Sequence, residues 1–266
     1  MLTLSIGVPG NRKEWRRAGR NVALEWPAYR CEEMGMGKKA RKTSNSGKSG
    51  SLQWAVGIAV VLVALLIGAQ WWSNRQDART ITQAAAYYGQ FPTQGTRIGS
   101  PDAPVHVEEY FDFQCPHCHT AAEQVVKRLL DSYVAEGKVQ FTYRFFPILG
   151  PESVQAARAA YCAMEMDAFW PYQELLMSKK GTGNRGTYSR DKLIDYARQM
   201  GLDVAQFRAC LDNDRSLQYV RQDYDQGVRM GLLGTPTFVV NGQIVNLTTW
   251  EDIFRVIDRA LAAAAR

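Results

Sequence analysis

A long run of apolar residues constrains the architecture of this chain more than any other feature of its sequence. Residues 52–72 contain no charged side chain. A helix of about twenty residues spans the hydrocarbon core of a bilayer at 1.5 Å per residue. A buried helix of a soluble protein is the alternative, but such helices are rarely apolar on every face. The run therefore predicts a single transmembrane helix, with interfacial anchors at Trp54, Trp71 and Trp72.

The charges before this run predict its orientation. Residues 1–50 hold eleven Lys and Arg against four Asp and Glu, and five of the basic residues lie close to the run: Lys38, Lys39, Arg41, Lys42 and Lys48. Positive loops stay cytoplasmic, so we expect residues 1–51 to form a cytoplasmic tail on a cell membrane and the rest to be exported. Residues 1–35 have no periodic pattern, and we interpret them as a mis-annotated start upstream of Met36, which leaves Cys31 without a role.

A cleaved signal peptide is the alternative to a retained anchor. The apolar run exceeds the roughly 7–15 residues of a signal-peptide core. The small residues Ala84–Ala86, which resemble a cleavage site, lie about a dozen residues beyond it. The length of the run favours the anchor.

The charge of the remaining body argues against nucleic acid as a partner. Although the sequence pI is about 9.1, residues 101–266 hold 18 Lys and Arg against 21 Asp and Glu. A nucleic-acid-binding domain requires a basic surface. The basic character of the chain belongs to its N-terminal tail.

The exported part begins with a polar stretch and continues as an α/β domain. We expect residues 73–97 to be a linker and residues 98–266 to be the domain. Strands are predicted over 105–113, 139–146 and 237–240, and helical patterns follow residue 116 and fill 151–231. Asn241-Gly242 predicts a hairpin turn, and a final helix is expected over Thr248–Ala264.

Two cysteines at the first turn of the first helix carry the chemistry. Cys115 and Cys118 are two residues apart and can close a small disulfide. The unpaired N–H groups at a helix start favour a thiolate, so Cys115 is the predicted nucleophile and Cys118 the resolving thiol. Pro116 fits the first helical position, and His117 can stabilise the Cys115 thiolate through a hydrogen bond or its charge. A stabilised thiolate makes the disulfide oxidising.

A zinc site is the alternative interpretation of this motif. Cys115, His117, Cys118 and His119 are all ligand types for zinc. A structural zinc site ordinarily requires a second ligand pair, and the other cysteines of the body lie far apart in helical sequence. We therefore expect no metal and no organic cofactor, only the redox-active pair of cysteines.

The sequence EEYFDFQCPHC, the helical stretch and GTPTFVVNG together resemble the DsbA-like thiol:disulfide oxidoreductases of the thioredoxin superfamily, in particular the membrane-tethered bacterial members. The resemblance covers residues 98–266. It implies a thioredoxin-like fold with an inserted all-helical subdomain. It also implies a cis peptide bond between Thr235 and Pro236, beside the active-site disulfide, which leaves the Thr235 backbone free to pair with a substrate peptide.

The resemblance further implies a buried acid beneath the active site, which maps to Glu109. A buried carboxyl could exchange a proton with Cys118. Glu108 would point to the opposite face of the strand, and Asp112 is a weaker substitute. His119 is expected to line the substrate surface.

Cys162 and Cys210 form the remaining pair, inside the helical insertion. In an oxidising compartment two such thiols either pair or stay buried as free thiols. We favour a structural disulfide. Some DsbA-like proteins resemble this chain in that they carry a non-catalytic disulfide in the helical domain.

These features predict an enzyme that introduces disulfides into reduced or unfolded exported proteins. The resemblance implies that a membrane quinone reductase of the DsbB or vitamin K epoxide reductase type reoxidises it. A membrane-tethered reductase or isomerase would use the same residues with the opposite electron flow. A chaperone-like client-binding module would need the fold without the thiols.

Overall fold

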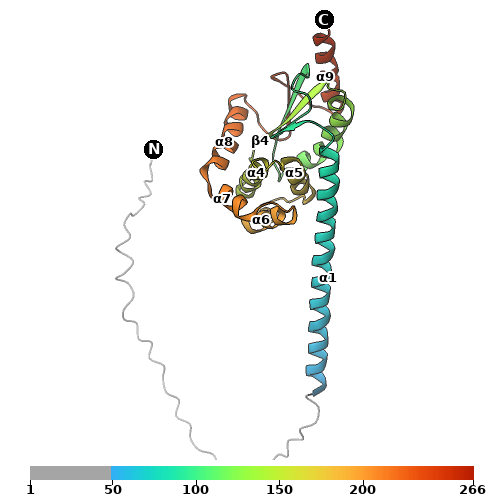
Figure 1. Ribbon diagram of the computed structural model, residues 1–266, viewed down its shortest axis with the longest axis vertical. Helices are drawn as coiled ribbons and strands as arrows, with labels where there is room; N and C mark the ends of the chain where they lie inside the picture. The colour runs from blue at the N-terminus through green and yellow to red at the C-terminus, as the bar shows by residue number, and fades with distance from the viewer. Residues whose placement is uncertain (1–48) are drawn as a thin grey trace, which may run out of the picture. The chain divides into compact units, whose positions relative to one another are not determined.

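A six-stranded mixed sheet forms the centre of the domain in the computed structural model, which describes residues 49–266 (Figure 1). The predictions for the basic tail, for the start at Met36 and for Cys31 lie outside these residues. The strand order is β1-β2-β4-β3-β5-β6, and only β3 and β4 run parallel. The strands are β1 (Thr93–Gln94), β2 (Arg97–Ile98), β3 (Val105–Phe111), β4 (Val139–Phe145), β5 (Thr237–Val240) and β6 (Gln243–Ile244).

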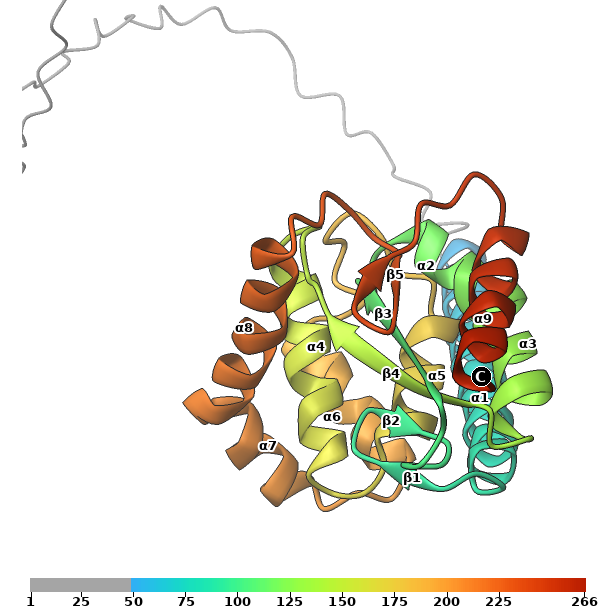
Figure 2. The same cartoon turned by 90° about the horizontal axis from the view of Figure 1, so that it is seen from above.

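Alternation along β3 separates the two faces of the sheet. Val105, Val107, Glu109 and Phe111 point to one face, which α9 (Glu251–Ala264) and the helix after β3 cover (Figure 2). The opposite face carries Glu108 and meets α8 (Asp214–Arg229), where Arg144 bridges Glu108 at 2.7 Å and Asp223 at 3.1 Å.

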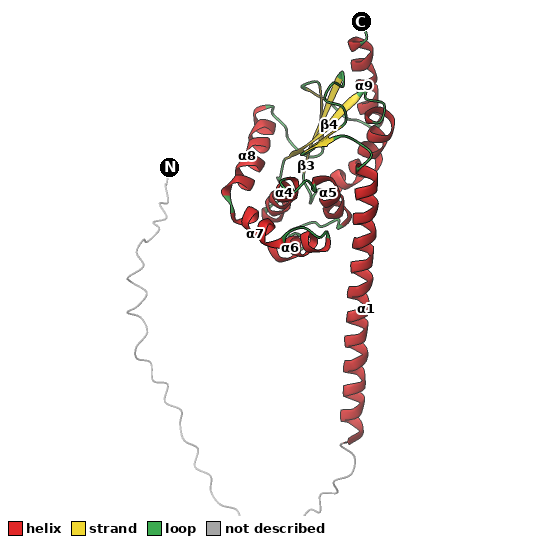
Figure 3. Cartoon of the chain, viewed as in Figure 1, coloured by secondary structure: helices red, strands yellow, loops and turns green. Residues whose placement is uncertain are grey.

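The chain between β4 and β5 is mainly helical, as Figure 3 shows. Its helices are α4 (Pro151–Met164), α5 (Phe169–Ser178), α6 (Arg190–Gln199), α7 (Val204–Asp212) and α8. A disulfide joins Cys162 of α4 to Cys210 of α7. The thioredoxin-like α/β fold with a helical subdomain is therefore confirmed.

The prediction of a polar linker over residues 73–97 is wrong. Helix α1 runs without a break over Ser49–Tyr88, and its last turns pack onto the domain. Strands β1 and β2 then form a hairpin that pairs Ile98 with Phe141 of β4. The mainly polar composition concealed a stripe of contact residues at helical spacing, Asp77, Ile81, Ala84 and Tyr88.

The last helix also begins later than its pattern indicates. Helix α9 starts at Glu251 because Asp252 turns its carboxylate back on the preceding loop. Its Oδ2 accepts the backbone N–H groups of Thr248 at 2.8 Å and Thr249 at 2.7 Å. These two bonds fix the backbone of Thr248 and Thr249 just before the helix, so this part of the chain is not helical. The Asn241-Gly242 turn between β5 and β6 has positive φ at both residues, as a type I′ hairpin requires.

One helix within residues 49–266 is long and apolar enough to cross a membrane. The candidate span is Trp54–Tyr88, and its most apolar window has a mean hydropathy of 2.1 with no part buried inside the protein. This agrees with the expected span over 52–72. The exposed apolar side chains of this window include Leu65, Leu66 and Ile67.

Candidate active site

Cys115 stands at the junction of β3 and the helix that follows it. It occupies the cap position, with an extended backbone, and Pro116 begins α2 (Pro116–Ala121). The helix continues through the π-helical turns η2 (Ala122–Val126) and η3 (Leu130–Val134), joined by α3 (Lys127–Leu129). The missing N–H of Pro116 leaves no backbone group unpaired at this position.

The Cys115 sulfur lies at the end of a hydrogen-bond network. In its protonated form the thiol donates to the backbone carbonyl of Thr235 at 3.2 Å, and the Thr235–Pro236 peptide bond is cis. A hydrogen bond from Cys118 lowers the pKa of Cys115 to about 5, helped by the backbone N–H groups of Cys118 and His117, although partial burial opposes the shift. Cys115 is therefore a thiolate at neutral pH when the pair is reduced.

The environment of Cys118 has the opposite effect. Burial raises the pKa of the Cys118 thiol well above its ordinary value, and its hydrogen bond to Cys115 and the nearby Glu109 carboxylate add to the shift. Cys118 is wholly buried. The two thiols thus differ in proton affinity, so a proton must be supplied or removed whenever the buried sulfur changes its bonding state.

Glu109 lies where it can supply a proton to Cys118 or remove one from it. It is wholly buried, and within residues 49–266 neither of its carboxylate oxygens has a hydrogen-bond partner. Burial, and secondarily the charge of Cys115, raises the pKa of Glu109 well above its usual range. Glu108 faces the other side of the sheet and pairs with Arg144. The structure therefore places Glu109, and not Glu108, beside the cysteines.

Asp112 does not serve as a substitute acid. Its carboxylate accepts the backbone N–H groups of Gln114 at 2.8 Å, Ile148 at 2.8 Å and Leu149 at 2.9 Å. The bonds from Ile148 and Leu149 tie the end of β3 to the loop after β4, and the bond from Gln114 fixes the turn before Cys115. Asp112 therefore shapes the backbone that presents Cys115.

Gln114 is a supporting residue that the sequence does not reveal. Its side-chain amide donates to the Ser153 hydroxyl at 2.9 Å and to the side-chain Oδ1 of Asn184 at 3.0 Å. Its Oε1 accepts the backbone N–H of Asn184 at 2.8 Å. The loop before Cys115 is thereby bonded to the helical insertion. The partners lie 39 and 70 positions along the chain, so no local pattern could indicate them.

The expectation that His119 lines the substrate surface is wrong. His119 is 6% exposed, and its Nε2 lies 2.7 Å from the carbonyl oxygen of Phe113. The helix turns this side chain inward, where it fixes the loop before the cysteines. The His117 side chain is exposed, and its contribution to the Cys115 sulfur comes from its backbone N–H. Within residues 49–266 no group of three His, Cys, Asp or Glu side chains is arranged to hold a metal ion.

The low pKa of Cys115 predicts a distinctive reactivity. In the reduced protein, the rate of Cys115 alkylation by iodoacetamide should rise through a midpoint near pH 5 and stay level above it, because the thiolate is the nucleophile. Replacement of Cys118 by Ala should raise the midpoint, since it removes the main hydrogen bond, whereas Cys118→Ser retains a donor. A wild-type midpoint near the ordinary thiol pKa of about 8.5 would contradict the geometry described above.

A buried acid, two unlike thiols and a cis-proline loop on this fold define a class, the thioredoxin-fold proteins that exchange thiols and disulfides. Comparison with known proteins identifies the family within this class. A family model described as thioredoxin matches residues 92–259. The chain is 29% identical over 219 residues to the probable disulfide bond formation protein D of Bacillus anthracis, covering 80% of this chain and 99% of that protein.

Solved structures similar to this chain are also thiol–disulfide oxidoreductases. Oxidised BdbD from Bacillus subtilis superposes with a TM-score of 0.59 at 25% identity, covering 65% of this chain and 96% of that one. A thioredoxin-like oxidoreductase from Silicibacter pomeroyi gives 0.54 at 30% identity, with coverage of 64% and 92%. The chain belongs to the thioredoxin superfamily and, within it, to the DsbA-like thiol:disulfide oxidoreductases.

Proposed function

We propose that this enzyme introduces disulfides into exported proteins through the pair Cys115 and Cys118. The observation that carries the proposal is the contrast between the two thiols, of which one has a pKa of about 5 and the other a strongly raised pKa. Stabilisation of the Cys115 thiolate favours the dithiol form of the enzyme. Its disulfide is therefore a strong oxidant of other thiols.

The exchange proceeds in two displacements. A client thiolate attacks the Cys115 sulfur of the enzyme disulfide, and the bonding electron pair passes to Cys118, which takes a proton from Glu109. The second client thiolate then attacks the client sulfur of the mixed disulfide and releases Cys115 as a thiolate. The client loses two electrons and gains a disulfide, and the enzyme is left as a dithiol. No metal or organic cofactor takes part in these steps.

The surface around Cys115 suits unfolded clients. The backbone of Thr235, at the cis-proline loop beside Cys115, can pair with an extended peptide when Cys115 is held in the disulfide and carries no thiol hydrogen. Leu233 is 99% exposed two residues before it, and Ile148 and Leu149 are 40% and 42% exposed on the loop bonded to Asp112. Backbone pairing and nonspecific apolar contact would accept many sequences.

Repeated turnover requires an electron acceptor. We propose a membrane quinone reductase of the DsbB or vitamin K epoxide reductase type, in which a quinone takes two electrons and two protons from the dithiol. The apolar window of α1 supports an anchor in the cell membrane, and the proposal puts the domain on its extracytoplasmic side. Confinement to one membrane raises the effective concentration of the two proteins.

The reduction potential of the Cys115–Cys118 couple tests the direction of electron flow. Equilibration with glutathione should give a value near that of DsbA, about −120 mV. The Cys162–Cys210 disulfide, joined in the helical insertion, should stay oxidised across the same series. A value near that of thioredoxin, about −270 mV, would make the protein a membrane-tethered reductase instead.

A further inference from the structure

The last turns of α1 are part of the catalytic domain. Along these turns Asp77, Ala84 and Tyr88 are buried, and Ile81 is packed against the core, while most side chains between them are exposed. This spacing places one face of the helix against the protein. The helix that enters the membrane is therefore the same helix that completes the core.

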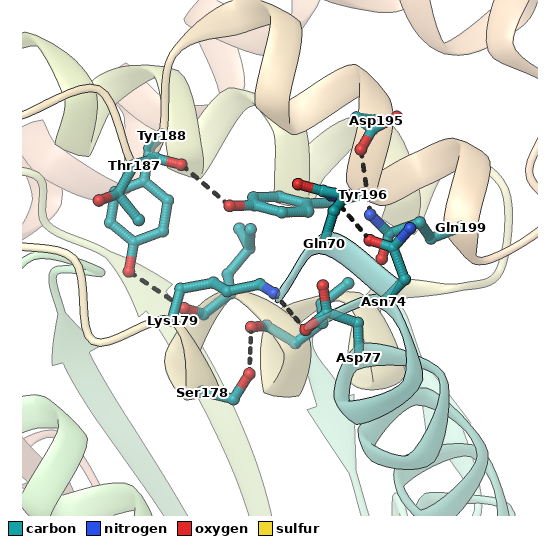
Figure 4. Close-up of polar contacts among 12 residues, drawn as sticks. Gln70, Asn74, Asp77, Ser178, Lys179, Thr187, Tyr188, Asp195, Tyr196 and Gln199 are labelled. Carbon is teal, nitrogen blue, oxygen red and sulfur yellow. Dashed lines mark hydrogen bonds and ion pairs between the residues drawn. The ribbon is translucent and has the colours of Figure 1, made fainter. Parts of the chain in front are cut away.

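Two polar contacts fix this face to α5. The carboxylate of Asp77 forms an ion pair with Lys179, and both side chains are nearly buried, 11% and 15% exposed (Figure 4). The Lys179 amine also lies 4.8 Å from the centre of the Tyr196 ring. Further along, the Tyr88 hydroxyl donates to Glu174 at 2.8 Å. A buried lysine deprived of its partner is unfavourable, so the pair resists separation.

A third contact reaches the helix that carries the cysteines. The Tyr87 hydroxyl donates to Asp131 at 2.7 Å, and the Lys127 amine lies 6.0 Å from the centre of the Tyr87 ring. Both partners belong to the continuation of α2. Helix α1 thus contacts the active-site helix directly, as well as α5.

The helical segment between the membrane span and these contacts has no hinge residue. From Ala69 to Tyr88 the sequence contains neither Gly nor Pro, and the helix is continuous. Asp77 lies only five positions after Trp72, the expected interfacial anchor, a rise of about 7.5 Å. Helices bend sharply mainly at Pro, Gly or π-bulges, so this connection is stiff.

We propose that Asp77, Tyr87 and Tyr88 are positioning residues that make α1 a rigid bracket, which holds the active-site helix in one orientation above the bilayer for exchange with the membrane acceptor. The inference rests on the proposed recycling at the membrane and adds how the encounter is organised. A fixed orientation removes the orientational search that a flexible tether would leave to chance. Exchange with soluble thiols and disulfides does not depend on it.

The test compares two reactions of the full-length protein in its membrane. One is reoxidation of the reduced enzyme by the membrane acceptor, and the other is its reaction with added glutathione disulfide. Lys179→Ala, which frees Asp77, should slow the first reaction about tenfold and leave the second within about twofold. Insertion of Gly-Ser-Gly-Ser between Ser73 and Asn74 should act in the same way. Lys180→Ala is the matched control: it removes the neighbouring ion pair with Glu123, whose two side chains are 60% and 63% exposed, and loss of so exposed a pair should change neither rate.

Either of two rate patterns would overturn the bracket. In one, Lys179→Ala and the insertion retain the wild-type rate with the membrane acceptor. In the other, both reactions slow in parallel, which means that the docked helix supports the active site as a whole and has no separate role in the encounter with the membrane acceptor. Hydrogen exchange provides a measurement that needs no acceptor: amides of residues 77–88 should be protected as strongly as those of β3, and exchange as fast as a loop would refute the docking. If the wild type is not reoxidised at the membrane while residues 77–88 stay protected, the proposed recycling fails and the docked helix stands.

Discussion

Replacement of Cys115 by Ser should abolish thiol–disulfide exchange, lowering the rate of client oxidation by at least about a thousandfold. Cys115 is the only one of the two sulfurs with a low pKa and a position at the helix start, whereas Cys118 is wholly buried. A serine hydroxyl at this site cannot form a disulfide or act as a comparable nucleophile. The measurement is the rate at which a reduced model protein regains its disulfides in a glutathione buffer.

The companion variant Cys118→Ser separates attack from resolution. It retains the Cys115 nucleophile, so an activated disulfide on a client should become trapped as a stable mixed disulfide with Cys115, visible by nonreducing electrophoresis and mass spectrometry. Trapping through residue 118 in a Cys115→Ser background would reverse the assigned roles. Full client folding by Cys115→Ser would instead support a chaperone-like client-binding function.

The elements that sequence reasoning identified are those whose signals are local. The alternation in β3, the helical spacing after Pro116 and the turn at Asn241-Gly242 each arise within a few residues. The placement of Glu109 and the cis bond before Pro236 came from resemblance to a family, and the structure has both features beside the cysteines. The bond between Cys162 and Cys210, favoured over two free thiols, is present as well.

What sequence reasoning missed depends on contacts between distant segments. His119 follows the motif and has the chemistry of a surface ligand, yet the orientation of the helix turns it toward Phe113. Asp77 lies in a mainly polar stretch, and the contacts that show this stretch is docked are with distant segments, such as Lys179, 102 residues away. The composition of a segment gives only its average hydrophobicity. Whether one face of a helix is buried depends on the residues that pack against that face.

Glu109→Leu should raise the stability of the domain and slow its chemistry. The wild-type carboxyl is buried and has no hydrogen-bond partner in the part of the chain that the structure describes. Such burial is unfavourable by about 1–3 kcal/mol, and leucine has a similar volume without the polar atoms. Its folded-state pKa is raised above the unfolded value, so the folded state binds the proton more tightly. Wild-type stability should therefore fall as pH rises from the unfolded carboxyl pKa of about 4.3 toward the folded one. The gain from Glu109→Leu, measured by urea unfolding, should be larger at pH 7 than at pH 4.

The same substitution removes the proton donor and acceptor for Cys118. General acid–base groups contribute about 10²–10⁴-fold, so the step that breaks or forms the bond to Cys118 should slow by at least about a hundredfold in stopped-flow measurements, and its pH dependence should change. Glu109→Gln provides the isosteric control, since its amide preserves the polar volume but cannot carry the proton, and it should be equally slow. Glu108→Gln, on the opposite face beside Arg144, should leave this step unchanged. A Glu109→Gln enzyme with the wild-type rate would show that the proton reaches Cys118 by another path and that the buried carboxyl has no part in the exchange.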